Sequence, residues 1–131
     1  MRAFFIDVVD KTVTQIQLGD DFTEISKKIG NGCEYFCCPY VFANNDTLYT
    51  DDESLLRPDN IKGGFMLLGY HSKLVGNGVI LGTDDEGESV DAKSSIDDIA
   101  SRITFLCEDE CKAYAKYITS RQPIIYTFKT T

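Results

Sequence analysis

One stretch near the middle of the chain, Leu74–Glu88, places the strongest constraint on the fold. It joins an apolar run, Val79-Ile80-Leu81, to an acidic turn, Asp84-Asp85-Glu86-Gly87-Glu88. Two of the three apolar residues are β-branched and glycines stand on both sides, which is typical of a short buried strand rather than a helix. Glycine beside a strand marks a bulge or a close approach of two backbones. The sequence therefore predicts a central strand over Leu74–Gly82 that ends in a carboxylate-rich loop.

The first thirty residues predict a β-hairpin followed by a short helix. Ala3–Val9 is apolar and β-rich, and Thr12–Leu18 alternates apolar with polar side chains. The two residues between these segments should form the turn of an antiparallel hairpin. Asp21 and Glu24 have the spacing of a capping box, for a helix that ends at Ile29-Gly30. We expect this helix to lie across the hairpin, because a lone hairpin cannot bury its apolar face.

The middle of the chain is a series of strands and turns. Cys33–Phe42 is β-rich, and Pro39 within it predicts either an edge strand or a bend. Thr47–Thr50 should pair with this segment after a turn at residues 43–46, and Phe65–Leu68 predicts a further apolar strand. Acidic residues open a single expected helical turn at Asp51–Leu56.

The last forty residues predict two helices and a final strand. Ser95 and Asp98 have the spacing of a helix N-cap. Glu108–Ser120 is the best-supported helix in the sequence, because apolar residues recur on one face at helical spacing. Its role, packing on the sheet or recruiting a partner, stays open at this point. Pro123 should end the helix, and Ile124–Phe128 is β-rich enough for a final strand.

Together these elements predict a single α+β domain over residues 1–131. A mixed, mostly antiparallel sheet of five to seven strands should carry two or three helices packed on one face. The length suits one domain. An apolar content of 43%, with eight phenylalanines and seven tyrosines, is sufficient for a hydrophobic core.

The net charge of −8 limits the ligands that the chain can bind. Free nucleic acid is disfavoured as a partner, because contacts with its phosphates require Lys and Arg side chains. An acidic surface suits solubility, metal ions or a basic protein partner. No apolar stretch is long enough for a signal peptide or a membrane span, so we expect a cytoplasmic protein with no membrane partner. Its five cysteines should stay reduced there.

Four segments of the chain resemble the pattern of a known family. They are the opening hairpin (Arg2–Asp7 with Lys11–Thr14), the helix end Ile29-Gly30, Leu48–Leu56, and Gly76–Glu88. They resemble a domain-of-unknown-function family found in bacteriophages and other mobile elements. The resemblance covers about residues 1–91 and implies no activity. It implies a small accessory protein of a phage or plasmid, acting in a bacterial host. Residues 92–131 would form a C-terminal helical extension that ends in a strand, so a role specific to this chain would reside there.

Seven carboxylates form the candidate partner-binding surface: Asp84, Asp85, Glu86, Glu88, Asp91, Asp97 and Asp98. A divalent-cation site is an alternative, because carboxylate oxygens are ligands of Ca²⁺. Calcium loops space their ligands around a glycine turn, whereas most of these acids are contiguous and alternate side chains would point apart. A solvated turn without a ligand is the third interpretation.

Cysteine and histidine residues offer alternative chemistry. The pairs Cys33/Cys37 and Cys107/Cys111 could in principle supply four thiolates to zinc, although free cysteine is more commonly a buried packing residue. His71, the only histidine, would need a nearby cysteine to form a nucleophilic pair, and is otherwise a loop residue. We therefore predict no catalytic residue, no metal and no cofactor.

An aromatic strand face is expected in Cys33–Phe42, formed by Tyr35, Phe36, Tyr40 and Phe42. If this segment is an edge strand, it could pair with a second copy, which would make a homodimer, or with another protein. Packing of the same aromatic residues in the core is the alternative.

Three functional hypotheses follow. The leading one is a non-enzymatic acidic binding protein of a phage or mobile element that inhibits a host defence system, of the CRISPR or restriction type. It would occupy a basic groove on a host defence protein. The second is an oligomeric sponge that sequesters a small signalling nucleotide through the backbone at Gly76–Gly82 with Arg and Lys side chains, although Gly76-Asn77-Gly78 lacks the third glycine and the helix of a dinucleotide site. The third is a small enzyme that uses His71 or a cysteine.

Overall fold

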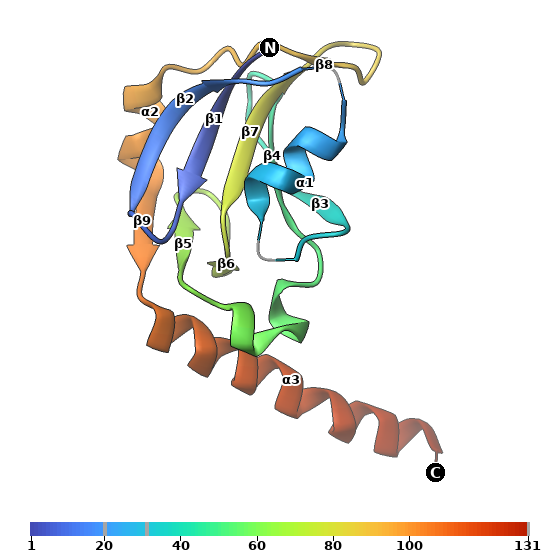
Figure 1. Ribbon diagram of the computed structural model, residues 1–131. Helices are drawn as coiled ribbons and strands as arrows, with labels where there is room; N and C mark the ends of the chain where they lie inside the picture. The colour runs from blue at the N-terminus through green and yellow to red at the C-terminus, as the bar shows by residue number, and fades with distance from the viewer. Residues whose placement is uncertain (20, 31, 131) are drawn as a thin grey trace.

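The computed structural model describes residues 1–19, 21–30 and 32–130, with side chains described up to residue 120. Within these residues two antiparallel sheets form the body of the molecule (Figure 1). The main sheet has six strands in the order β2-β1-β7-β4-β3, with the short β8 paired to β7. The bounds of its strands are β1 Arg2–Asp7, β2 Thr12–Gln17, β3 Phe36–Val41, β4 Asp46–Asp51, β7 Gly78–Thr83 and β8 Ser89–Val90.

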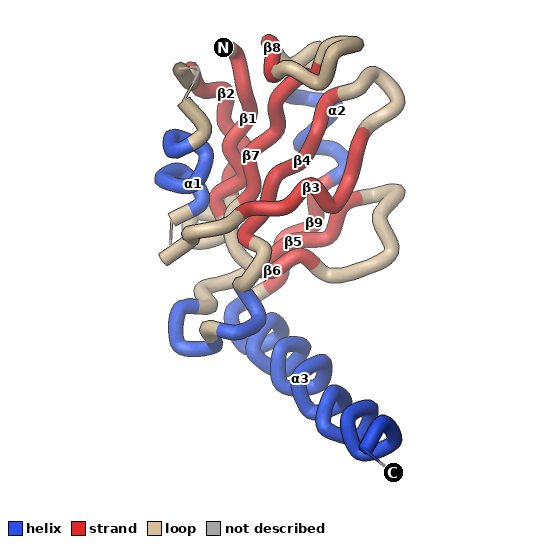
Figure 2. Tube along the Cα trace, turned by 90° about the vertical axis from the view of Figure 1, so that its right-hand side faces the viewer, coloured by secondary structure: helices blue, strands red, loops and turns tan. Residues whose placement is uncertain are grey.

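The second sheet has three strands in the order β6-β5-β9. Figure 2 shows it beside the lower part of the main sheet, with the longest helix leading away beneath it. The bounds of the remaining elements are β5 Gly64–Leu67, β6 Leu74–Val75, β9 Ile103–Leu106, α1 Thr23–Ile29, α2 Ile96–Arg102, α3 Glu108–Thr130, and the 3-10 turns η1 Ser54–Leu56 and η2 Pro58–Asn60.

The largest apolar cluster lies between the two sheets. Phe4 and Ile80 of the main sheet meet Phe65 of the second sheet and Ile99 of α2, and all four side chains are fully buried. Burial of apolar side chains from both layers stabilises the molecule by about 1.5–3 kcal/mol for each large residue. This cluster fixes the two sheets and α2 as one unit.

Two smaller clusters attach the other helices. Ala3 and Val79, on the opposite face of the main sheet, pack against Ile25 of α1. Leu106 on the second sheet packs against Cys111 of α3. The single α+β domain with a mostly antiparallel sheet is therefore confirmed. The prediction that the helices pack on one face is wrong, because α1 and α2 cover opposite faces of the main sheet.

β7 is the centre of the main sheet, paired with β1 on one side and β4 on the other. Its apolar run Val79-Ile80-Leu81 is fully buried, which confirms the predicted central strand. The prediction of one strand over Leu74–Gly82 is wrong, because this stretch divides into β6 and β7, which belong to different sheets.

The chain passes between the two sheets at Gly76 and Asn77. Gly76 has a φ of +93°, a conformation that favours glycine. The Asn77 side chain accepts a hydrogen bond from the Val8 N–H at 2.9 Å and donates one to the Ile29 carbonyl at 3.1 Å. These hydrogen bonds fix the break between β6 and β7 through residues that are distant in the sequence. The local sequence pattern therefore did not indicate that the strand divides here.

The predicted hairpin is confirmed, and the predicted capping box is wrong. β1 and β2 pair in register, but four residues rather than two connect them, and Lys11 closes the turn with a φ of +56°. In α1, the Asp21 carboxylate accepts the N–H of Thr23 at 2.9 Å, and Phe22 takes the N-cap position with no side-chain hydrogen bond. The predicted helix end is confirmed at Gly30, which has a φ of +70°.

β3 is an edge strand of the main sheet, as Pro39 predicted. Its pairing with β4 shifts between Cys37 and Tyr40, the position of a bulge. Proline lacks an N–H, so it disrupts the ladder least at an edge. The predicted helical turn in Asp51–Leu56 is present as η1.

Asp46 begins β4 and is fully buried. Its carboxylate accepts the N–H of Lys93 at 2.9 and 3.2 Å and the N–H of Ser94 at 2.8 Å. Asn44 adds a bond from its side-chain amide to the Ser94 hydroxyl at 3.0 Å. These contacts join the β3–β4 turn to the segment between β8 and α2. The assignment of residues 43–46 to a turn is therefore wrong for Asp46, which is a core residue.

The C-terminal part begins as predicted and ends differently. Ser95 caps α2 by accepting the Asp98 N–H at 3.2 Å. α3 begins at Glu108 as expected, but its backbone stays helical to Thr130, so the predicted strand Ile124–Phe128 is wrong. A strand needs a partner, and α3 leads away from both sheets (Figure 1). None of the helices in the described part of the chain has the length and apolar character needed to cross a bilayer.

Candidate functional site

The acidic turn is the loop of a hairpin between β7 and β8. The Asp84 carboxylate accepts the N–H groups of Glu86 at 2.9 Å and Glu88 at 2.8 Å, and Gly87 has a φ of +85°. Asp84 therefore organises the turn with its own side chain, as Asp does in short loops. Gly87 supplies the left-handed residue that closes it.

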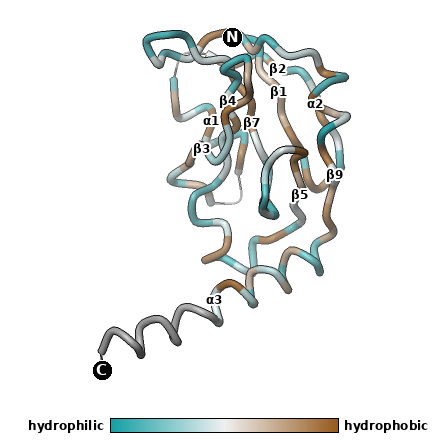
Figure 3. The backbone as a smooth tube through the Cα atoms, turned by 180° about the vertical axis from the view of Figure 1, so that it is seen from behind, coloured by the Kyte–Doolittle hydropathy of each residue, from teal (hydrophilic) through white to brown (hydrophobic). Residues whose placement is uncertain are grey.

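The other acids of this loop are directed to solvent. Asp85, Glu86 and Glu88 are exposed, and none of them forms an ion pair within the described residues. Asp91 follows β8, is exposed, and accepts the N–H of Arg2 at 2.7 Å. We call the five residues Asp84, Asp85, Glu86, Glu88 and Asp91 the acidic end. Figure 3 shows the β7–β8 loop as hydrophilic.

Asp97 and Asp98 do not join the acidic end. They lie in the first turn of α2, and Figure 1 shows this helix and the β7–β8 loop on opposite sides of the molecule. Asp98 also lies 3.7 Å from Arg102, which partly balances its charge. Five of the seven predicted residues thus come together and two do not, because the path from β8 to α2 crosses the width of the sheet.

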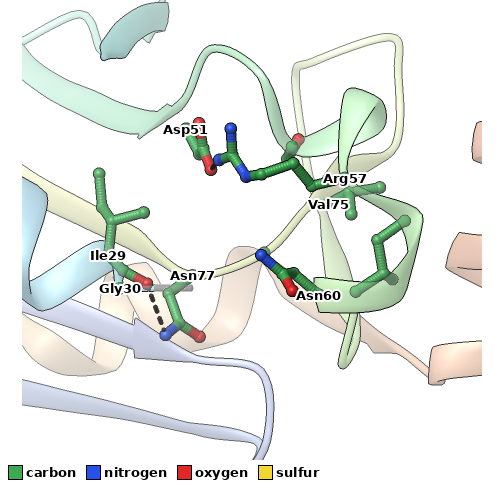
Figure 4. A pocket seen from close by; sticks show the side chains of 10 residues that line it. Ile29, Gly30, Asp51, Arg57, Asn60, Val75 and Asn77 are labelled. Carbon is green, nitrogen blue, oxygen red and sulfur yellow. Dashed lines mark hydrogen bonds and ion pairs between the residues drawn. The ribbon is translucent and has the colours of Figure 1, made fainter. Parts of the chain in front are cut away.

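The glycine stretch predicted as a nucleotide-binding backbone is mostly inside the sheet. A Cβ at Gly78 would lie 3.0 Å from Leu48 Cδ1 and 3.1 Å from Phe65 Cζ, so this glycine allows close packing of the core. The Gly76-Asn77 crossing lines a pocket (Figure 4).

That pocket is small and has a charged wall. Arg57 forms an ion pair with the buried Asp51, and the Asn77 side chain points to the Ile29 carbonyl (Figure 4). The pocket volume is about 20 Å³, the size of a single water molecule rather than a nucleotide. The Asp51–Arg57 pair holds η1 and η2 against the end of β4, which gives it a structural role.

The cysteines are distributed over separate parts of the molecule. Cys33 packs in the cluster under α1, whereas Cys111 packs in the cluster under α3, so the two CxxxC pairs do not form one four-thiolate site. Within the described residues, no group of three or more His, Cys, Asp or Glu side chains is arranged to hold a metal ion. Burial raises the pKa of the Cys111 thiol to about 11, and the neighbouring Cys107 and Glu110 add to this shift.

We expect iodoacetamide to modify the exposed Cys107 well before the buried Cys111. With a pKa of about 11, only about one Cys111 thiol in a thousand is ionised at pH 8, and the thiolate is the reacting form. Modification of Cys111 should accelerate about tenfold for each pH unit up to that pKa. Peptide mass spectrometry after timed quenching measures both rates. Denatured protein is the control, and equal rates at pH 8 in the folded protein would contradict this assignment.

His71 lies in the exposed loop after β5. Its ring packs against Tyr70 with centroids 4.8 Å apart. It forms no hydrogen bond or ion pair with any cysteine in the described part of the chain. The Cys–His pair that the enzyme hypothesis would require is therefore not seen among the described residues.

Two polar residues with clear structural roles were missed in the sequence. Asp46 falls in a predicted turn, and Arg57 directly precedes Pro58, a position typical of a loop. Their roles depend on partners that local pattern does not specify, namely the backbone of Lys93 and Ser94, and the Asp51 carboxylate. No signal within the sequence alone would have found them.

Comparison with known proteins gives no assignment. No protein-family model matches the sequence, and neither curated proteins nor solved structures give a match.

Proposed function

We propose that this protein is a non-enzymatic binding protein whose acidic end docks on a basic surface of a protein target. The observation that carries the proposal is the group of exposed carboxylates on the β7–β8 hairpin, which have no cationic partner in the described residues. A net charge of −8 adds a long-range field of the same sign. Such a field accelerates encounter with a basic partner and selects against acidic ones.

The rigidity of the loop favours binding as well. Asp84 accepts the backbone N–H groups of Glu86 and Glu88, so the backbone that carries the exposed carboxylates is ordered before any partner arrives. A surface that is ordered in advance loses less conformational entropy on binding. The hairpin would therefore present its charges to a partner with little further loss of conformational entropy.

The resemblance of residues 1–91 to a phage and mobile-element family favours a target in a host defence system. A host defence nuclease has a basic groove for nucleic acid, and an acidic protein can occupy such a groove. We therefore propose a target among the nucleic-acid-binding proteins of a CRISPR or restriction system. The protein would act as an inhibitor that contacts protein and not nucleic acid.

Charge reversal at the acidic end tests this proposal. The variant carries Asp85→Lys, Glu86→Lys and Glu88→Lys, and retains Asp84 because that residue organises the loop. A protein captured from bacterial extract by the wild-type chain should bind the variant about tenfold more weakly or worse at low salt. The salt dependence of binding should also become smaller, because fewer charge pairs remain to be screened. Surface plasmon resonance over a salt series measures both effects.

A matched control changes the same charge at other sites. Asp10→Lys, Glu34→Lys and Asp59→Lys reverse three exposed acids outside the acidic end. The control should retain the affinity of the wild type within about threefold, since only the net charge changes. Equal loss of affinity in both variants would show a general charge effect, and no loss in either would reject the acidic end as the docking surface.

A further inference from the structure

The two edges of the main sheet differ in how they are protected. β3 has Pro39 and a register shift between Cys37 and Tyr40, and both features hinder the addition of another strand. β2, at the opposite edge, pairs with β1 over all six of its residues without a shift. Its sequence, Thr-Val-Thr-Gln-Ile-Gln, contains no proline, glycine or charged residue. A regular, uncharged edge strand of this kind is able to accept a further strand.

Hydrogen bonds at the end of β2 establish which of its residues bond to β1. The Leu18 N–H donates to the Met1 carbonyl at 2.9 Å, and the Met1 ammonium donates to the Leu18 carbonyl. Hydrogen-bonded and non-bonded pairs alternate along an antiparallel ladder. Ile16 and Thr14, opposite Ala3 and Phe5, therefore bond to β1.

The intervening residues of β2 direct their backbone outward. By the same alternation, the N–H and C=O groups of Val13, Gln15 and Gln17 point away from the sheet. In the described part of the chain these groups have no hydrogen-bond partner. α2 lies against β2 and enters the core through Ile99, but no hydrogen bond joins α2 to the outward groups of β2 within the described residues.

We propose that β2 pairs antiparallel with β2 of a second copy, so that two main sheets form one continuous sheet across a two-fold axis. The axis is perpendicular to the sheet and places Gln15 opposite Gln15, with Val13 opposite Gln17 at both ends. The outward groups of the three residues then form about six hydrogen bonds across the axis. Each face of one sheet continues into the same face of the other.

The distribution of charge favours a second copy as the occupant. Two molecules of net charge −8 repel each other over most of their surfaces. Along β2, however, self-pairing brings no like charges opposite each other, because the strand is uncharged. Polar side chains of Thr and Gln can also form hydrogen bonds across such a pair.

The strength and the salt dependence of this dimer follow from its geometry. One strand pair buries less surface than a permanent dimer, so association should depend on concentration in the micromolar-to-millimolar range, on the order of 100 μM. Added salt screens the repulsion between copies and should strengthen the dimer. This salt effect is opposite to the one expected for binding at the acidic end, so the two proposals can fail independently.

Sedimentation equilibrium from about 10 μM to about 1 mM tests the dimer. The mass should rise with concentration from 14.7 kDa towards twice that value. Gln15→Pro should stay monomeric throughout, because proline blocks the edge. It should keep the fold, because the N–H that it removes does not bond to β1. Gln15→Thr is the matched control, and it should dimerise like the wild type because it keeps both the N–H and a β-forming side chain.

Amide hydrogen exchange locates the interface directly. The N–H groups of Val13, Gln15 and Gln17 should exchange rapidly in dilute protein and slow down as concentration rises, whereas Thr14 and Ile16 should be protected throughout. If Gln15→Pro perturbs the hairpin, Gln15→Lys provides the same test, since it places two like charges opposite each other. A wild type that is monomeric at every concentration, or a dimer that neither variant weakens, would overturn the proposal.

Discussion

Replacing Asp46 with alanine should lower the free energy of unfolding by about 3 kcal/mol. The carboxylate is fully buried and accepts the N–H groups of Lys93 and Ser94. Alanine would leave both donors without their acceptor, and an unsatisfied buried group costs about 1–3 kcal/mol. In a domain of this size the midpoint of thermal unfolding should fall by about 10 °C. Differential scanning calorimetry of Asp46→Ala and wild type measures this difference.

Two further variants show whether the loss of stability comes from the buried hydrogen bonds of Asp46 or from the removal of a carboxylate in general. Asp46→Asn keeps one oxygen acceptor but places a donor where the second acceptor was, so its stability should lie between those of the wild type and Asp46→Ala. Asp85→Ala removes an exposed carboxylate that has no ion pair in the described residues, and should change stability by less than about 0.5 kcal/mol. A similar small change for Asp46→Ala would mean that the carboxylate does not hold the segment before α2.

The second large effect is expected at Phe65, whose side chain has no exposed surface and fills the space between the sheets. Phe65→Ala should lower the free energy of unfolding by about 4 kcal/mol, through lost burial and the cavity that remains. Chemical denaturation with urea measures the change. Leu68→Ala is the matched control, because Leu68 follows β5 directly and is 72% exposed. It should cost less than about 0.5 kcal/mol.

Combining a substitution at Gly78 with Phe65→Ala tests the Phe65 prediction further, because a side chain at position 78 would contact the Phe65 ring. A methyl group at position 78 would lie 3.1 Å from Phe65 Cζ and 3.0 Å from Leu48 Cδ1. Gly78→Ala alone should therefore be destabilising through overpacking, by about 1–3 kcal/mol. In the Phe65→Ala background the same methyl would enter the vacated space, so its cost should fall. Additive effects of the two substitutions would show that the ring does not occupy the position described.

Elements whose burial is visible in local pattern could be predicted from the sequence. β7 is buried on both faces and appears as a continuous apolar run, while β1 and β2 appear as two β-rich segments separated by a turn. The break at Gly76-Asn77 could not be predicted, because the Asn77 side chain holds it through Val8 and Ile29. The predicted C-terminal strand Ile124–Phe128 is wrong for a related reason. Its residues have high β propensity, but a strand also requires a neighbouring strand to pair with, and propensity does not reveal whether one is present.

The candidate site was predictable to the extent that it is contiguous. Asp84–Glu88 lie together because they share one loop, and their hairpin geometry follows from Asp84 and Gly87. Asp97 and Asp98 were grouped with them by proximity in sequence, whereas the chain between β8 and α2 separates them in space. How far apart two segments lie in a sheet depends on the order of its strands, and this order cannot be read from the composition of either segment.

The position of β7 has a consequence for how the chain folds during its synthesis. β7 lies between β1 and β4, so the hairpins β1–β2 and β3–β4 do not touch each other directly in the sheet. Phe4 pairs with Ile80, and Leu48 pairs with the same residue on its other side. During synthesis on the ribosome, the two hairpins therefore remain separate and partly exposed until β7, which ends at Thr83, has emerged and can pair with both of them. Pairings between such distant residues slow folding and expose strand edges, so chaperones should engage this chain before β7 appears.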